Sequence, residues 1–310
     1  MKKIFKNLIL ILFSLSLVII LTETSLRIFG LGDPIIYEKN LIYGYQPKKN
    51  QKIKRYRNYN ITINSENFRV NKEYVGYPEK IYFLGDSVTY GGSYIDDKNI
   101  FSSKTCEYLY KKKINFSCFN AGVNAYGFEN IINRYNYVFE MNNNSYYVIT
   151  LIPGSFYRNY IQIDSLPYFT KSISDKFLKA SIELLAFALD KIRQKIRFNN
   201  QVSYKENLNS ELKQKILNDL NLLKHLKNEN PKLIILISLS NSKKVKDFNL
   251  ELEKFILQNS EQMNLDIINI QSKIEKNIVE KIFYDNIHLN KAGHEIYGKI
   301  LSDLIIDGQK

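Results

Sequence analysis

Three residues of this 310-residue chain have the types that acyl-transfer chemistry uses. Ser87 follows the apolar run 81–84 after two intervening residues, and Asp285 and His288 stand just before a C-terminal helical pattern whose N-cap is expected at Asn290. A serine acts as a nucleophile when a histidine takes its proton and a carboxylate holds that histidine. Because such a set is defined by roles in space, the three residues form a candidate catalytic set despite their separation in sequence.

Each of these residues also has a structural interpretation. A serine that follows Gly-Asp is commonly a turn residue, and an isolated Asp-x-x-His segment is commonly a surface turn. His288 is one of only three histidines in the chain. His225 lies on the polar stripe of a predicted helix and is expected to be solvated. His294 lies in the last predicted helix and is expected to cap or pack there.

Short apolar runs alternate with helical patterns from Lys80 to the C-terminus. Strands that alternate with helices at this spacing predict a parallel sheet covered by helices on both faces. Ligand sites in such sheets lie beyond the carboxyl ends of the strands, where Ser87, Gly122 and Ser155 are expected. The predicted strands are 81–84, 116–120, 146–152, 233–239 and 265–270, and the predicted helices are 101–111, 128–139, 211–227, 248–259 and 291–306.

One segment does not fit this alternation. Residues 160–207 lie between the third and fourth predicted strands, and their helical part, 172–198, is apolar in its middle and basic at its end. The pattern fits a helix packed on the edge of the domain, a lid over the site, or a helix that lies on a membrane surface. The first interpretation is favoured as the simplest.

The N-terminal segment predicts a membrane anchor. Lys2, Lys3 and Lys6 precede the run Leu8–Leu21, which contains no charged residue. The run is short for a spanning helix and also suits the apolar region of a signal peptide. No small-x-small cleavage pattern ends it, so we expect an uncleaved anchor that contacts the lipid bilayer through residues 4–29. Positive charge before the run places the N-terminus in the cytoplasm and the rest in the periplasm or outside the cell.

Composition divides the chain into three parts. Residues 1–30 form the signal anchor or transmembrane helix. Residues 31–78, rich in Tyr, Asn, Lys and turn residues, form an extended or β-rich arm with a short strand at 58–64. Residues 79–310 form the α/β domain, which includes the helical insertion at about 160–207.

Charge and cysteine content argue against several classes of protein. Of the net charge of +13, residues 2–57 hold +8, with eleven Lys or Arg against three Asp or Glu. The basic run 48–57 lies on no nucleic-acid-binding module, so no nucleic acid partner is expected, and contact with anionic lipid or polysaccharide explains the charge equally well. Cys106 and Cys118 are compatible with one disulfide or with two buried thiols. No metal or organic cofactor is implied.

Three segments, 85–87, 120–122 and 285–290, together resemble the sequence blocks of the SGNH (GDSL-type) hydrolase superfamily. The likeness covers roughly Lys80 to the C-terminus, and the anchor, the arm and residues 64–69 resemble membrane-anchored bacterial members. The resemblance implies a flavodoxin-like three-layer α/β/α sandwich with a five-stranded parallel sheet. It also implies that Ser87 is the nucleophile, that His288 is the base oriented by Asp285, and that the N–H groups of Ser87 and Gly122 line the oxyanion hole. The segments are Gly85-Asp86-Ser87, Asn120-Ala121-Gly122 and Asp285-Asn286-Ile287-His288-Leu289-Asn290.

The chain departs from this family at the third block. That block reads Gly-x-Asn-Asp in the family, and its Asn side chain is a further oxyanion donor. Here residues 152–159 read Ile-Pro-Gly-Ser-Phe-Tyr-Arg-Asn, with Ser155 at the Asn position. Ser155, or Asn159 if the loop folds back, is therefore the candidate for the third donor. Loss of one such donor costs ~10²–10³ in rate.

The predicted function is ester hydrolysis through an acyl-Ser87 intermediate, with the O-acyl groups of a cell-envelope glycan as a candidate substrate. An O-acyltransferase acting on polysaccharide is an alternative, because transfer shares the same intermediate. A non-catalytic glycan-binding or assembly protein is a second alternative, since the third block is changed. A lipid-active hydrolase with the insertion as its lid is a third, and fold alone does not choose among them.

Overall fold

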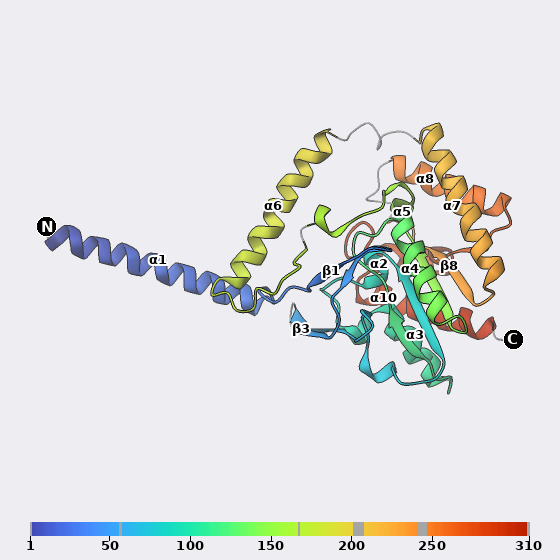
Figure 1. Ribbon diagram of the computed structural model, residues 1–310, viewed down its shortest axis with the longest axis horizontal. Helices are drawn as coiled ribbons and strands as arrows, with labels where there is room; N and C mark the ends of the chain where they lie inside the picture. Colours follow the sequence, from blue (N-terminus) through green and yellow to red (C-terminus); the bar gives the residue numbers. More distant parts are fainter. Residues whose placement is uncertain (1, 56–57, 167, 201–207, 241–246, 309–310) are drawn as a thin grey trace.

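A five-stranded parallel sheet forms the centre of the protein, seen in a computed structural model that describes residues 2–55, 58–166, 168–200, 208–240 and 247–308 (Figure 1). The strand order β6-β5-β7-β8-β9 places β5 between β6 and β7, and every pairing is parallel. The predicted α/β fold with five parallel strands is confirmed. The strands are β5 (Lys80–Gly85), β6 (Ser117–Asn120), β7 (Tyr146–Leu151), β8 (Leu233–Ile237) and β9 (Ile267–Asn269).

Helices cover both faces of this sheet. Alternate residues of each strand point to opposite sides, so each strand contributes side chains to a core on either face. Ile81 and Phe83 of β5 belong to the core beneath α3 and α10. Tyr82 and Leu84 belong to the core beneath α4, α7 and α8. The helices are α3 (Phe101–Lys111), α4 (Phe128–Met141), α7 (Ser210–Glu229), α8 (Asp247–Gln262) and α10 (Lys291–Asp307), each within three residues of its predicted bounds.

Residues 31–78 form two antiparallel hairpins that pack on the α/β domain. Tyr45, Ile61 and Phe68 are buried in the same core as the α4 face of the sheet. The backbone of Arg69 pairs with that of Asn120 at the end of β6, through N···O contacts of 2.9 and 3.0 Å. This segment is therefore built into the domain. Its strands are β1 (Tyr37–Asn40), β2 (Gly44–Pro47), β3 (Gln51–Arg55) and β4 (Tyr59–Ile63).

Two long helices extend from the junction of these parts (Figure 1). Among the described residues, one helix, α1 (Lys2–Ile28), is long and apolar enough to cross a membrane, and its apolar window is fully exposed. The second helix, α6 (Lys179–Asn200), begins seven residues later than the predicted helix 172–198. The last part of the predicted insertion, 201–207, lies outside the described residues.

Cys106 and Cys118 form a disulfide that joins α3 to β6, with 6.2 Å between their Cα atoms. Sequence reasoning left the choice between a disulfide and two thiols open. The bond closes a short loop that contains the turn between the helix and the strand.

The disulfide is expected to contribute about 3 kcal/mol to the free energy of unfolding, because it closes a loop of about a dozen residues in the unfolded chain. The double variant Cys106→Ser/Cys118→Ser should show this loss in urea unfolding. Dithiothreitol should lower the stability of the wild type and leave the variant unchanged. A wild-type curve that does not respond to reductant would contradict the assignment.

Candidate active site

Ser87 stands at the carboxyl edge of the sheet, at the first position of the short helix α2 (Ser87–Tyr90), directly after β5. The turn between them requires Gly85, whose φ is +154° and whose added Cβ would lie 2.1 Å from Oγ1 of Thr89. Asp86 caps α2 by accepting from the N–H of Val88 at 2.9 Å. The turn therefore fixes the position of Ser87.

His288 reaches Ser87 from the loop before α10. Its Nε2 lies 2.7 Å from Oγ of Ser87. The loop is closed by the backbone pairing of Phe283 with Leu289. Asn290 caps α10 by accepting from the N–H of Gly293 at 3.0 Å, which confirms the predicted N-cap.

Asp285 holds both the side chain and the backbone of His288. Its Oδ2 lies 2.7 Å from Nδ1 of His288, and its Oδ1 accepts from the N–H groups of Ile287 and His288 at 2.9 and 2.8 Å. A carboxylate only accepts hydrogen bonds, so Nδ1 carries the proton and Nε2 is left to accept from the Ser87 hydroxyl. Partial burial raises the pKa of Asp285, but these hydrogen bonds outweigh it and lower the pKa below its ordinary value. The structure brings the three predicted residues into one hydrogen-bonded chain.

The predicted oxyanion donors differ in whether they are free to bind a substrate. The N–H of Ser87 is at the start of a helix, where it has no partner within the helix. The N–H of Gly122 donates to Oδ1 of Asn120 at 2.9 Å. Ser155 is fully buried and accepts from the N–H of Ile152, whereas Asn159 is exposed. In this structure the Gly122 N–H donates within the protein, whereas the Ser155 hydroxyl accepts a hydrogen bond and is buried.

Arg158 is a residue of this site that sequence reasoning missed. Its Nη1 donates to Oδ2 of Asp86 at 3.0 Å and to the carbonyl oxygen of Tyr126 at 3.2 Å. Asp86 is fully buried, so Arg158 supplies the countercharge for a carboxylate that caps the helix of Ser87. The sequence signal was an arginine seven residues after the end of β7, so it follows the carboxyl end of a strand, as Ser87 does.

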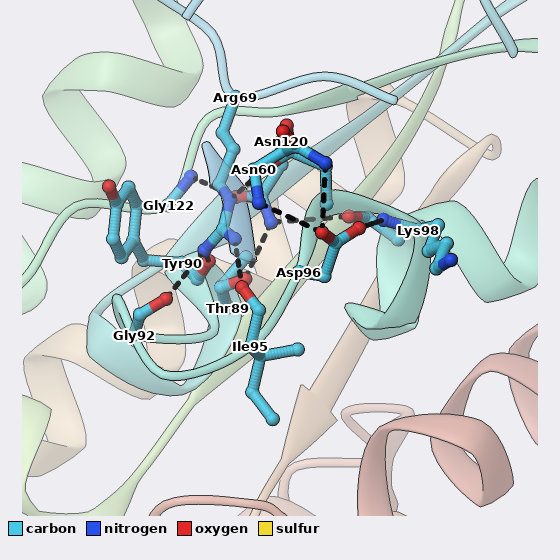
Figure 2. A network of polar contacts seen from close by, with 12 residues as sticks. Asn60, Arg69, Thr89, Tyr90, Gly92, Ile95, Asp96, Lys98, Asn120 and Gly122 are labelled. Atoms are coloured by element: carbon cyan, nitrogen blue, oxygen red, sulfur yellow. Dashed lines mark hydrogen bonds and ion pairs between the residues drawn. The ribbon is translucent and has the colours of Figure 1, made fainter. Parts of the chain in front are cut away.

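The buried side chain of Arg69 organises the loop that follows α2 (Figure 2). Its Nη1 donates to the carbonyl oxygens of Tyr90 and Gly92 at 2.9 and 2.7 Å, and its Nη2 donates to that of Ile95. Its Nε pairs with Oδ1 of Asp97 at 2.8 Å. The guanidinium of Arg69, which follows β4, thus contacts several positions of the loop 90–97.

Asn120 completes this support of α2 (Figure 2). Its Nδ2 donates to the carbonyl oxygen of Thr89 at 2.6 Å, and its Oδ1 accepts from Gly122. A Cβ added to Gly122 would lie 2.5 Å from the backbone nitrogen of Tyr90, so only glycine allows this close packing. Asn60 of β4 binds Asp96 through its N–H at 2.8 Å, which adds a second contact between the hairpins and the loop.

The other two histidines do not belong to the hydrogen-bonded set of Ser87, His288 and Asp285. His225 is exposed and lies 3.2 Å from Glu229, as expected for a solvated residue. His294 is completely buried, and its Nδ1 accepts from the N–H of Phe101 at 3.1 Å, so it caps α3. Burial, with smaller effects from Arg69 and His288, lowers the pKa of His294 to about 3.

Buried, neutral His294 is expected to make the protein acid-sensitive. In the unfolded chain the pKa of His294 is about 6.5. Below that pH this histidine is therefore protonated in the unfolded state but stays neutral in the folded state. Stability is fully present above pH ~6.5 and falls by ~1.4 kcal/mol per pH unit as pH drops towards the folded pKa. Urea unfolding from pH 7 to pH 4.5 measures this slope.

The variant His294→Asn keeps an acceptor for Phe101 and cannot titrate. It should be less stable at pH 7 and lose less stability on acidification than the wild type. Equal slopes in the two proteins would contradict this source of acid sensitivity.

Fold and site together define an α/β protein with a hydrogen-bonded Ser-His-Asp arrangement at the carboxyl edge of its parallel sheet. No protein-family model and no curated protein matches the chain. Similar solved structures include an acetylxylan esterase from Geobacillus stearothermophilus, with 12% identity and a TM-score of 0.45 over 75% of this chain and 96% of that one. A lipase/acylhydrolase from Enterococcus faecalis has 15% identity and a TM-score of 0.47 over 73% and 95% of the two chains. A lipolytic G-D-S-L family protein from Veillonella parvula has 13% identity and a TM-score of 0.40 over 74% and 98%.

Proposed function

We propose that this protein is a serine esterase of the SGNH type, with Ser87 as nucleophile, His288 as general base and Asp285 as the residue that orients His288. The observation that carries the proposal is the continuous chain of two 2.7 Å contacts from Ser87 through His288 to Asp285. A surface turn with only a structural role does not require a contact between its imidazole and a serine in a different part of the fold. The same pairing is what nucleophilic catalysis requires.

The reaction follows from the positions of these protons. Oγ of Ser87 attacks the ester carbonyl while Nε2 of His288 takes the hydroxyl proton, and the tetrahedral intermediate breaks down when His288 gives that proton to the leaving alcohol. Water then attacks the acyl-Ser87, with His288 again as base, and releases the acid. The negative charge of Asp285, held by its lowered pKa, stabilises the imidazolium in both steps.

The oxyanion of the intermediate is assigned first to the N–H of Ser87 at the start of α2. The N–H of Gly122 adds a second donor if Oδ1 of Asn120 shares it with the substrate. Arg158 is a positioning residue in this scheme, because it neutralises Asp86 and so holds the turn that presents Ser87. We assign no direct role to Ser155 or Asn159.

The substrate class is an ester, and O-acyl groups of a cell-envelope glycan are the proposed source. Location supports this source, because α1 is proposed to anchor the chain in a membrane with the α/β domain outside the cytoplasm. His288 and Asp285 have side chains 26% and 46% exposed, so the site opens to solvent. Such a site admits a polymer chain and a sugar hydroxyl as alternative acyl acceptor, so transfer is the second candidate function.

The test is the mass of the intact protein after incubation with p-nitrophenyl acetate and with a fluorophosphonate. We expect one added group, located on Ser87 by peptide mapping, and no addition to a Ser87→Ala variant. Turnover of the acetyl group by water supports the esterase, and turnover only when a sugar acceptor is added supports the transferase. Failure of both reagents to modify Ser87 would favour the non-catalytic glycan-binding alternative.

A further inference from the structure

The helix α6 exposes a large apolar surface. Seven apolar side chains on and just before it are exposed, including Leu185 at 59% and Ile192 at 57%. Soluble proteins rarely leave so many large apolar side chains of one helix exposed without a partner. The seven are Phe177, Ile182, Leu184, Leu185, Phe187, Leu189 and Ile192.

The first turn of α6 is fixed to the end of α1. The buried carboxylate of Glu23 accepts from the N–H groups of Ala180 and Ser181 at 3.0 and 2.9 Å, and from the hydroxyl of Ser181 at 2.7 Å. A carboxylate at the N-terminus of a helix satisfies N–H groups that have no partner within the helix. Arg27 of α1 adds a bond to the carbonyl oxygen of Phe177 at 2.6 Å. The two helices are therefore joined by a specific polar contact.

The same turn is also fixed to the N-terminal hairpins. Glu183 is fully buried, accepts from the N–H of Gly32 at 2.6 Å and receives two bonds from the guanidinium of Arg55 at 2.9 and 2.5 Å. Lys179 pairs with Asp33 at 2.8 Å. From this fixed base α6 runs across the line of α1 rather than alongside it (Figure 1). The direction of α6 is therefore fixed by its contacts with α1 and with residues 32, 33 and 55.

We infer that α6 lies on the surface of an anionic lipid bilayer, with the side chains of Leu185 and its apolar neighbours in the interfacial region. The inference rests on the proposed role of α1 as a membrane anchor. If α1 crosses the bilayer, its end at Ile28 is at the membrane interface. The axis of α6 starts near this end and crosses the axis of α1 (Figure 1), so α6 runs along the membrane surface. Amphipathic helices of this kind insert ~5–10 Å into the headgroup boundary.

Charge favours an anionic bilayer over a second copy of the chain as the occupant. Lys191 and Arg193 are exposed beside Ile192 on α6. Basic side chains next to an apolar surface are attracted to anionic lipid headgroups, whereas a second copy of this basic chain would bring like charges together. The helix α1, which contacts α6, is itself exposed and apolar.

The test uses the full-length chain in vesicles of phosphatidylglycerol and phosphatidylcholine. The sequence has two cysteines, and both are in the disulfide, so one introduced cysteine gives a single site for an environment-sensitive fluorophore. Leu185→Cys reports on α6. Leu12→Cys reports on the middle of α1. Leu222→Cys is the matched control, an exposed leucine on α7, which lies far from α1 in Figure 1.

We expect the probe at Leu185 to emit at shorter wavelength and to be quenched by lipids that carry a nitroxide near the headgroup, and the probe at Leu222 to do neither. Quenching at Leu12 together with water-like emission at Leu185 overturns the inference and leaves the anchor intact. A blue shift at Leu185 without quenching by lipid shows that protein covers α6, which also overturns it. No quenching at Leu12 removes the anchor and the inference together. None of these outcomes depends on ester hydrolysis, so the proposed esterase activity is tested separately.

Discussion

Replacement of Ser87 by alanine is expected to reduce kcat for p-nitrophenyl acetate by roughly 10³-fold or more, because the acyl-enzyme route is closed. The hydroxyl is at the open edge of the site, and its recorded side-chain partner is Nε2 of His288. Its loss should therefore change the free energy of unfolding by no more than about 0.5 kcal/mol. Initial rates and urea unfolding of the purified variant measure the two effects.

Ser93→Ala is the matched control, since Ser93 lies in the loop that follows α2 and has no role in the proposed mechanism. It should retain the wild-type rate. A Ser87→Ala enzyme that hydrolyses the ester at the wild-type rate would remove the mechanism. A Ser87→Ala enzyme that has unfolded would instead point to a structural role, and circular dichroism separates these cases.

Arg69→Leu is expected to lower the free energy of unfolding by ~3–5 kcal/mol, the cost of breaking a buried ion pair by removing one partner. The change leaves Asp97 with hydrogen bonds from Thr62 but without its ion-pair partner, and removes the guanidinium donor of the carbonyl oxygens of residues 90, 92 and 95. Burial raises the pKa of Asp97 even beside Arg69, so its charge would be poorly tolerated alone. Loss of the loop should also lower kcat, because residues 90–97 follow directly from the helix of Ser87.

A second substitution separates the charge from the hydrogen bonds. In Arg69→Leu/Asp97→Leu no unpaired carboxylate remains, so part of the lost stability should return. The activity should stay low, because the carbonyl oxygens of the loop still lack the guanidinium donor. Full recovery of kcat in the double variant would show that Arg69 does not position the loop of Ser87.

The fold was predictable because its signals are local. Strands β5 and β7 are apolar runs with turn residues at their ends, and α3 and α10 carry apolar residues at helical spacing. The alternation of these patterns implies a parallel sheet. The proximity of Ser87 and His288 follows because both lie at the carboxyl edge of the sheet.

The supports of the site were not predictable in the same way. Arg69 precedes the first strand of the sheet and acts on a loop more than twenty positions later, and nothing in its neighbours marks it as buried. Arg158 pairs with Asp86 across 72 positions. Contacts that form only in the folded protein leave no periodic pattern in the sequence. The sequence therefore indicated the proposed catalytic residues and not the side chains that hold them in place.

The separation of 201 positions between Ser87 and His288 has a consequence for the newly made chain. At ~5–20 residues per second of synthesis, Ser87 leaves the ribosome ~10–40 s before His288, its proposed general base. During that interval the serine has no imidazole to take its proton. In the proposed mechanism, the protein therefore stays inactive towards esters until the loop that carries His288 has been made and has docked at the carboxyl edge of the sheet.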